Sequence, residues 1–275
     1  MSDDTRNKTT LVLGGTGKTG SRVAARLVEL GRPVLVGSRT GEPRFEWDDE
    51  STWPACLSGA GSVYIVYYPE LAFPGVAETI SAFTEAAVSH GVRKLVLLSG
   101  RGVEKDAGPS EDAVRESGAS WTILRCSWFS QNFDEGWLLP AVLDGDIMLP
   151  AGDTPEPFID AGDIADVAVA ALTTDDHDGR TYELAGPRLM TFGDAAGEIA
   201  EATGRDVRYS PVTFVEYADV LRQQGLPRAF VEVFRTILDG RNAHLVDGVE
   251  QALGRPARDF RDYARKAAET GVWKV

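Results

Sequence analysis

Cysteine and histidine are scarce in this chain, whose 275 residues include two cysteines and three histidines. Cys56 and Cys126 lie far apart and lack the spacing of metal ligands, and the histidines are equally dispersed. We therefore expect neither disulfides nor a bound metal. Each cysteine is expected to be a small buried side chain at the end of a structural element.

Long hydrophobic runs and positive charge are also in short supply. No stretch approaches the roughly 18 consecutive apolar residues of a membrane-spanning helix, and residues 1–8 do not resemble a signal peptide. The 28 lysines and arginines are outnumbered by 42 aspartates and glutamates, which gives a net charge of -14. Such a chain repels a phosphate backbone. We expect a cytoplasmic protein that binds neither nucleic acid nor membrane.

The first half of the chain alternates short apolar runs with amphipathic stretches of helix length. The apolar runs predict strands at 9–13, 33–37, 62–67, 94–98 and 121–125. The amphipathic stretches predict helices at 21–30, 75–89 and 111–117. The strands are almost continuously apolar, as expected where both faces of a sheet are covered. This order is typical of an α/β protein with a doubly wound parallel sheet.

The local composition of the chain changes near residue 150, where three prolines fall within eight positions. We place a domain boundary there, with a larger domain at 1–150 and a smaller, mostly helical lobe at 151–275. The chain is expected to return to the sheet near 158–185. Helices are predicted at 164–172, 192–202 and 214–223, and short strands at 158–159, 181–184 and 207–209. Three pairs have capping-box spacing, namely Asp160 with Asp163, Thr191 with Asp194, and Thr213 with Glu216.

The most informative motif is the glycine loop of residues 14–20, which reads Gly-Gly-Thr-Gly-Lys-Thr-Gly between a strand and a helix. Glycines with this GxxGxxG spacing allow a tight turn and let backbone N–H groups approach a pyrophosphate. A P-loop is excluded, because its first glycine would fall at Val12, inside the strand. The loop therefore predicts a dinucleotide site that includes Gly14, Thr16, Gly17, Lys18, Thr19 and Gly20.

The end of the second strand indicates which dinucleotide is bound. Proteins that prefer NAD place a carboxylate there, whereas this chain has Ser38 and Arg39. A guanidinium beside a hydroxyl can form charge-assisted hydrogen bonds with a 2′-phosphate. We therefore predict NADP(H) as the cofactor. The alternative for Arg39 is an ordinary solvated surface cation.

Several segments together resemble the NmrA-like group of atypical short-chain dehydrogenases/reductases, which includes NADPH-dependent quinone and triphenylmethane reductases and redox-sensing regulators. The similar segments are 14–20, 45–49, 92–99, 117–125, 128–133 and 158–165. The resemblance implies a Rossmann domain that binds NADP(H), and a small C-terminal lobe that closes over a planar or aromatic substrate.

The resemblance also implies positions for further cofactor-binding residues. Trp47 and Asp48 would lie against the adenine, and Tyr67 and Tyr68 near the middle of the cofactor. Ser99 and the turn at 126–128, which contains Ser127, would border the nicotinamide. For each aromatic residue the alternative is core packing.

One departure from the wider superfamily concerns the proton donor. Typical members carry a Tyr-x-x-x-Lys pair, in which the lysine lowers the tyrosine's pKa. This chain has no tyrosine between Tyr68 and Tyr182. Lys105, in the loop expected after the strand that carries Ser99, is the candidate catalytic residue. Its alternative is a solvated loop cation.

An aromatic group follows the strand at 121–125, where the carboxyl ends of parallel strands usually hold ligands. Its members, Trp128, Phe129, Phe133 and Trp137, are expected to contact the substrate, or else to pack between the lobes. We predict an NADP(H)-dependent oxidoreductase that transfers hydride to a small quinone, dye or enone and could form a homodimer. The alternative is a non-catalytic NADP(H) sensor acting through protein contacts. An isomerase or epimerase is weaker, because it normally needs the missing tyrosine.

Overall fold

A six-stranded parallel sheet forms the centre of the computed structural model, which describes residues 8–223 and 229–275. The strand order is β2-β1-β3-β4-β5-β7. The strands are β1 (Thr9–Leu13), β2 (Val34–Gly37), β3 (Ala60–Ile65), β4 (Lys94–Gly100), β5 (Ser120–Cys126) and β7 (Arg180–Leu184). The order reverses beside β1, so the sheet is doubly wound, as the sequence predicts.

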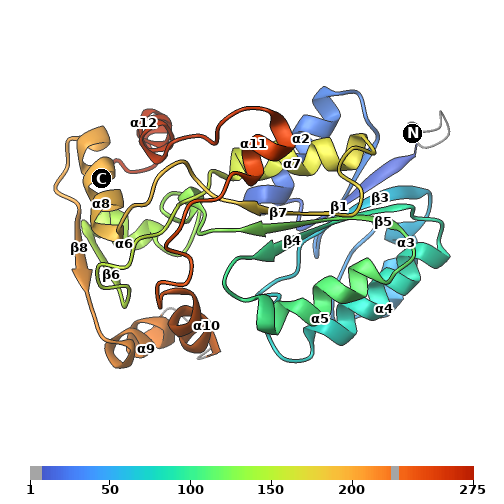
Figure 1. The fold of residues 1–275 in the computed structure, drawn as a ribbon, viewed down its shortest axis with the longest axis horizontal. Coiled ribbons are helices and arrows are strands. Elements are labelled where there is room, and N and C mark those ends of the chain that lie inside the picture. Colours follow the sequence, from blue (N-terminus) through green and yellow to red (C-terminus); the bar gives the residue numbers. More distant parts are fainter. Residues whose placement is uncertain (1–7, 224–228) are drawn as a thin grey trace.

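Helices cover both faces of this sheet (Figure 1). One face carries α3 (Trp53–Leu57), α4 (Val76–Ser89) and α5 (Glu104–Arg115), and the other carries α2 (Lys18–Glu29), α7 (Ala161–Thr173) and α11 (Gly248–Leu253). Strand β1 shows why the strands are mainly apolar. Leu11 and Leu13 pack into the core under α4, while Val12 packs into the core under α2 and α7. The apolar residues of such a strand thus alternate between the two cores.

A second group of elements lies beyond the carboxyl ends of the strands (Figure 1). Its two parallel strands are β6 (Asp146–Leu149) and β8 (Arg208–Pro211). Its helices are α6 (Leu139–Asp144), α8 (Phe192–Thr203), α9 (Phe214–Gln223), α10 (Ala229–Ile237) and α12 (Phe260–Thr270). We call this second group of strands and helices the lobe. Outside both groups, two short 3-10 turns lie at Glu50–Thr52 and Ser130–Asn132. Between β6 and α8 the chain returns to the sheet for α7 and β7, and it does so again for α11.

Two local expectations are wrong. The strand expected at 158–159 is only an isolated bridge between Phe129 and Ile159. The helix expected at 111–117 is α5, which begins seven residues earlier at Glu104 and contains Pro109. Gly108 and Pro109 disfavour a helix locally, but the missing proline N–H costs only one backbone hydrogen bond there. The pattern also gave no expectation for α3, α6, β6, α10, α11 or α12. None of the helices in the described part of the chain has the length and apolar character needed to cross a bilayer.

The capping pairs have different outcomes. Thr191 and Asp194 form the expected box at the start of α8, and Thr213 and Glu216 exchange the same hydrogen bonds before α9. The box expected at α7 is wrong. The Asp160 carboxylate accepts from the Gly162 N–H at 2.6 Å, whereas the Asp163 carboxylate turns to the arginines before α12. For the Asp163 carboxylate, pairing with positively charged arginines is stronger than a hydrogen bond to a neutral backbone N–H at the start of the helix.

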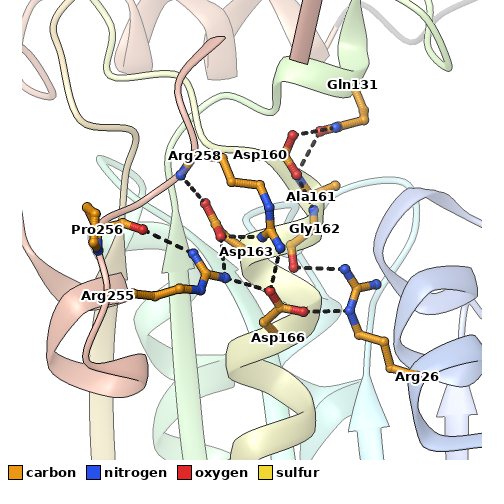
Figure 2. Close-up of polar contacts among 10 residues, drawn as sticks. All are labelled: Arg26, Gln131, Asp160, Ala161, Gly162, Asp163, Asp166, Arg255, Pro256 and Arg258. Atoms are coloured by element: carbon orange, nitrogen blue, oxygen red, sulfur yellow. Dashed lines mark hydrogen bonds and ion pairs between the residues drawn. The ribbon is translucent and has the colours of Figure 1, made fainter. Parts of the chain in front are cut away.

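These arginines belong to an ion cluster that joins three distant segments (Figure 2). Arg26 of α2 contacts the Asp166 carboxylate of α7 at 2.5 Å. Arg255 lies 2.7 Å from the Asp163 carboxylate, and the Arg258 N–H donates to the same carboxylate at 2.7 Å. Asp163 is fully buried. The cluster thereby fixes the segment before α12 against the sheet, on which α7 packs.

Removing the buried carboxylate should therefore be costly. We expect Asp163→Ala to lower the free energy of unfolding by about 1–3 kcal/mol, because the Arg258 backbone N–H and two guanidinium groups lose a fully buried acceptor, although both arginines keep their pairing with Asp166. Asp219→Ala is the matched control, since Asp219 pairs with Arg222 on the exposed face of α9 and should cost under about 0.5 kcal/mol. Urea denaturation measures both. Equal costs for the two variants would contradict a structural role for the cluster.

A second buried carboxyl lies in the lobe and lacks such partners. The backbone of Glu156 pairs with that of Met190, and its side chain is fully buried. Neither carboxyl oxygen is hydrogen-bonded to a described residue. Burial raises the pKa of Glu156 to about 8, although the positive charge of Arg101 opposes the shift. The folded protein therefore holds this carboxyl in its neutral form at pH 7.

This raised pKa predicts how stability depends on pH. The unfolded chain loses the Glu156 proton near pH 4.5, while the folded chain keeps it up to about pH 8. Stability from this group is thus complete below pH 4.5 and is lost as pH rises to about 8. Relative to wild type, Glu156→Gln should gain on the order of 5 kcal/mol between these limits. Denaturation curves across pH, with the exposed Glu201→Gln as control, would contradict this if wild type and Glu156→Gln stayed parallel.

Candidate functional site

A cavity of 740 Å³ opens at the carboxyl ends of the strands, between the sheet and the lobe. Its walls come from the loops after β1, β3, β4 and β5 and from α10. Parallel strands all end at this edge, so the loops that follow them converge there (Figure 1). The cavity joins the glycine loop to the aromatic residues after β5.

The glycine loop forms the first wall. The Gly17 N–H donates to the Gly14 carbonyl at 2.8 Å, and Gly14 has a φ of 62° that favours glycine. A Cβ at Gly20 would come within 2.3 Å of the Gly14 carbonyl oxygen, so only glycine fits. Helix α2 begins at Lys18, directly after Gly17, and no side chain caps it. The free N–H groups of its first turn thus face a space that fits the pyrophosphate of a dinucleotide.

Lys18, Thr16 and Thr19 line the cavity beside this turn. Burial lowers the pKa of Lys18, and the nearby carboxylates Glu135 and Asp134 partly offset the shift. Glu135 is engaged elsewhere, because its carboxylate accepts from the Arg22 guanidinium at 2.9 Å. Burial also raises the pKa of Asp134 to about 6, and its carboxylate accepts from the Tyr263 hydroxyl at 2.7 Å. The ammonium of Lys18 therefore remains available to an anion in the cavity.

The residues expected around the adenine side lie at the ends of β2 and β3. Ser38 and Arg39 directly follow β2, and Arg39 is exposed. The indole N–H of Trp47 donates to the Val66 carbonyl at 3.3 Å, and its ring lies 5.1 Å from that of Tyr67. Burial and the charge of neighbouring Asp48 raise the pKa of Tyr67.

Of these expected residues, Tyr67 and Tyr68 line the cavity, and Ser38, Arg39, Trp47 and Asp48 do not. Trp47 also packs edge-on against Phe45 and Phe83, so it is partly a core residue. These four residues thus lie in the segment that follows β2, outside the wall of the cavity.

Ser99, at the end of β4, lines the cavity, and its hydroxyl donates to the Glu111 carboxylate at 2.8 Å. Glu111 is fully buried in α5, and Arg125 and Arg115 also donate to it. Burial raises the pKa of Glu111, but hydrogen bonds from Arg125 and Ser99 outweigh it and hold the pKa below its usual range. Ser99 is therefore fixed by an ionised carboxylate.

Arg101 is a site residue that the sequence analysis missed. It lines the cavity just after β4, is 3% exposed, and donates to the Ser127 hydroxyl oxygen at 2.8 Å. A second guanidinium nitrogen lies 2.9 Å from His244 Nε2. The only local signal was a charged residue directly after an apolar strand. The partner segment at 242–244 is far away in sequence, so no local pattern indicates that the charge is buried.

The aromatic wall contains three of the four expected residues. Trp128, Phe129 and Trp137 line the cavity, whereas Phe133 is fully buried among the phenylalanines of the lobe core. Helix α10 adds residues that the sequence analysis missed, namely Phe230, Val233, Phe234 and Ile237. The ring of Trp128 stacks on that of Phe234 at 5.5 Å. This end of the cavity is thus flat-walled and apolar.

Lys105 does not reach the cavity. It lies in the first turn of α5, is exposed, and is not among the lining residues. The structure thus provides no contact through which this ammonium would act on a ligand in the cavity.

Similar proteins place the chain in a family. No protein-family model matches it. It is 33% identical to agroclavine dehydrogenase of Claviceps fusiformis, over 96% of this chain and 98% of that protein. Among solved structures, an NADPH-dependent quinone oxidoreductase of Escherichia coli in complex with NADPH matches with a TM-score of 0.77 at 21% identity, over 94% and 99% of the two chains.

A second solved structure is NmrA, a negative transcriptional regulator in complex with NAD, with a TM-score of 0.72 at 15% identity over 97% of each chain. These two structures show the fold, and the identity to agroclavine dehydrogenase over nearly the full length of both chains shows common descent. The chain belongs to the NmrA-like family of atypical short-chain dehydrogenases/reductases.

Proposed function

We propose that this protein is an NADPH-dependent reductase that transfers hydride to a small conjugated or aromatic electrophile. The observation that carries the proposal is the continuity of the cavity, which runs from the glycine loop to the aromatic wall of Trp128 and α10. A dinucleotide whose pyrophosphate lies at the loop would extend its nicotinamide toward that wall. Support also comes from the relatives, one named a dehydrogenase and one an NADPH-dependent quinone oxidoreductase.

The chain's own residues would mainly bind and orient. Lys18 and the first-turn N–H groups of α2 would hold the pyrophosphate, and Arg39 the 2′-phosphate. NADPH, when bound, supplies the hydride. Trp128, Phe129 and Trp137 would hold a planar acceptor against the nicotinamide and exclude water from the reacting atoms. Positioning is thus the main contribution of the protein to catalysis.

Regulatory sensing is the second candidate. It is favoured by the absence of a Tyr-x-x-x-Lys pair from the sequence and by the similarity to NmrA, a transcriptional regulator. A sensor would bind NADP(H) without consuming it.

The choice of cofactor is testable at Arg39. NADPH should bind more tightly than NADH, and Arg39→Ala should weaken NADPH binding about 10- to 100-fold, because it removes hydrogen bonds to a charged phosphate. Arg93→Ala is the matched control. This exposed arginine directly precedes β4, at the amino ends of the strands, whereas the cavity lies at their carboxyl ends. Calorimetry gives both dissociation constants. Equal affinity of the wild type for NADPH and NADH would refute the assignment.

Turnover is testable with a panel of quinones, enones and triphenylmethane dyes, followed by NADPH absorbance. Trp128→Ala should lower kcat/KM about tenfold, because it removes a stacking surface from the acceptor site. Lys105→Ala should change little, since Lys105 lies outside the cavity. A loss of about 10²–10⁴-fold in Lys105→Ala would instead identify a general acid. No NADPH consumption with the whole panel, despite bound cofactor, would favour the sensor.

A further inference from the structure

Two serines line the cavity at the ends of neighbouring strands, and their hydroxyl groups have opposite hydrogen-bonding roles. Ser99 gives its hydrogen to Glu111, whose ionised carboxylate can only accept. Ser127 accepts from Arg101, whose guanidinium can only donate. The hydrogen of the Ser127 hydroxyl has no acceptor among the described residues. Of these two, Ser127 alone therefore has a hydrogen to donate to a ligand in the cavity.

Arg101 is held firmly behind Ser127. Besides His244 Nε2, it contacts the Glu183 carboxylate at 3.5 Å, and its backbone carbonyl accepts from the Asn242 amide at 3.2 Å. Glu183 is partly exposed. The charge of Arg101 also acts on the pKa of Glu156, whose buried carboxyl is not hydrogen-bonded to a described residue. The guanidinium thus places a buried positive charge beside the Ser127 oxygen, with the partly exposed carboxylate of Glu183 on its other side. A nearby cation strengthens a hydroxyl as a donor to a developing negative charge.

We propose that Ser127, polarised by Arg101, donates the hydrogen bond that stabilises the reduced substrate, and that the pair selects acceptors whose charge develops on oxygen. The inference rests on the proposed reductase function and deepens it. Ser127 would be the catalytic residue and Arg101 the positioning residue. The arrangement, a hydroxyl beside a fixed cation, has the same chemical logic as the Tyr-x-x-x-Lys pair that the chain lacks.

The step balances as follows for an enone or quinone. A bound NADPH would supply the hydride. In the acceptor a C–H bond forms at the electrophilic carbon, the adjacent C=C bond shifts toward the carbonyl carbon, the carbonyl π bond breaks, and its electron pair settles on oxygen. Ser127 donates a hydrogen bond to that oxyanion, and a solvent water supplies the proton that completes the reduction. Ser127 and Arg101 end the step unchanged.

By the same chemistry, the reduction of one substrate class should not depend on Ser127. A cationic triphenylmethane dye accepts hydride at its central carbon and becomes neutral, so no oxyanion forms. The buried charge of Arg101 also repels a cation. The pair should therefore favour quinones and enones over cationic dyes.

Kinetics with matched substrates test the proposal. Ser127→Ala should lower kcat for quinones and enones about 10²-fold with a smaller change in KM, as expected when one donor to an oxyanion is removed. Ser127→Thr, which keeps the hydroxyl, should recover most of the rate. Ser130→Ala is the control, because Ser130 is buried three residues along the chain and does not line the cavity. Unchanged quinone turnover in folded Ser127→Ala would overturn the proposal and leave the reductase function standing.

A measurement without turnover separates the two claims. Para-nitrophenol, titrated spectroscopically against the protein loaded with NADP⁺, should show an apparent pKa about 1–2 units lower in wild type than in Ser127→Ala. Arg101→Lys should keep part of the shift and Arg101→Gln should lose it, which a purely structural role of Arg101 would not produce. If the shift is present but NADPH is never consumed, the donor pair stands and the reductase function fails. An identical phenol pKa in wild type and Ser127→Ala overturns the donor role.

Discussion

Burial of both faces of the parallel sheet is the constraint on which the rest of the structure depends. Strands such as β1 contact a core on each side, so the few polar side chains within the strands are paired inside the protein, as Thr10 is with Ser62. The polar side chains that can meet a ligand lie where the strands end, and in a parallel sheet those ends share one edge. The glycine loop, Ser99, Arg101 and Ser127 all lie there because the chain has no other place to display them beside a ligand.

The lobe turns this edge into a cavity, and charge holds it in place. The cluster around Asp163 ties the segment before α12 to α2 and α7, while contacts of Arg101 with residues 242–244 tie the segment after α10 to the end of β4. Helix α10, which supplies the opposite wall, is therefore anchored close to the cavity. The same buried arginine would set the electrostatics of the site in the proposed mechanism. That double role would account for a full charge at 3% exposure, where an apolar side chain would pack at lower cost.

Sequence patterns predicted what depends on local chemistry. Most strands of the central sheet, its doubly wound class, the glycine loop and two capping boxes follow from hydrophobic period, glycine conformation and side-chain hydrogen bonds within a few residues. The failures concern interactions between distant segments. Asp163 has the spacing of a cap but pairs with arginines 92 and 95 residues away. Arg101 and the aromatic residues of α10 gave no local sign that they meet in one cavity, because burial is decided by which segments pack together.

A crystal structure of the protein with NADP⁺ and para-nitrophenol tests the central claim most directly, since the claim is that one cavity holds a dinucleotide and an oxygen-centred acceptor side by side. The account predicts the pyrophosphate at the loop of residues 14–20, the phenol ring against the aromatic wall that contains Phe129 and Trp137, and the phenol oxygen within hydrogen-bonding distance of Ser127 Oγ. A phenol oxygen directed away from Ser127 and Arg101, or a dinucleotide bound outside the cavity, would contradict it.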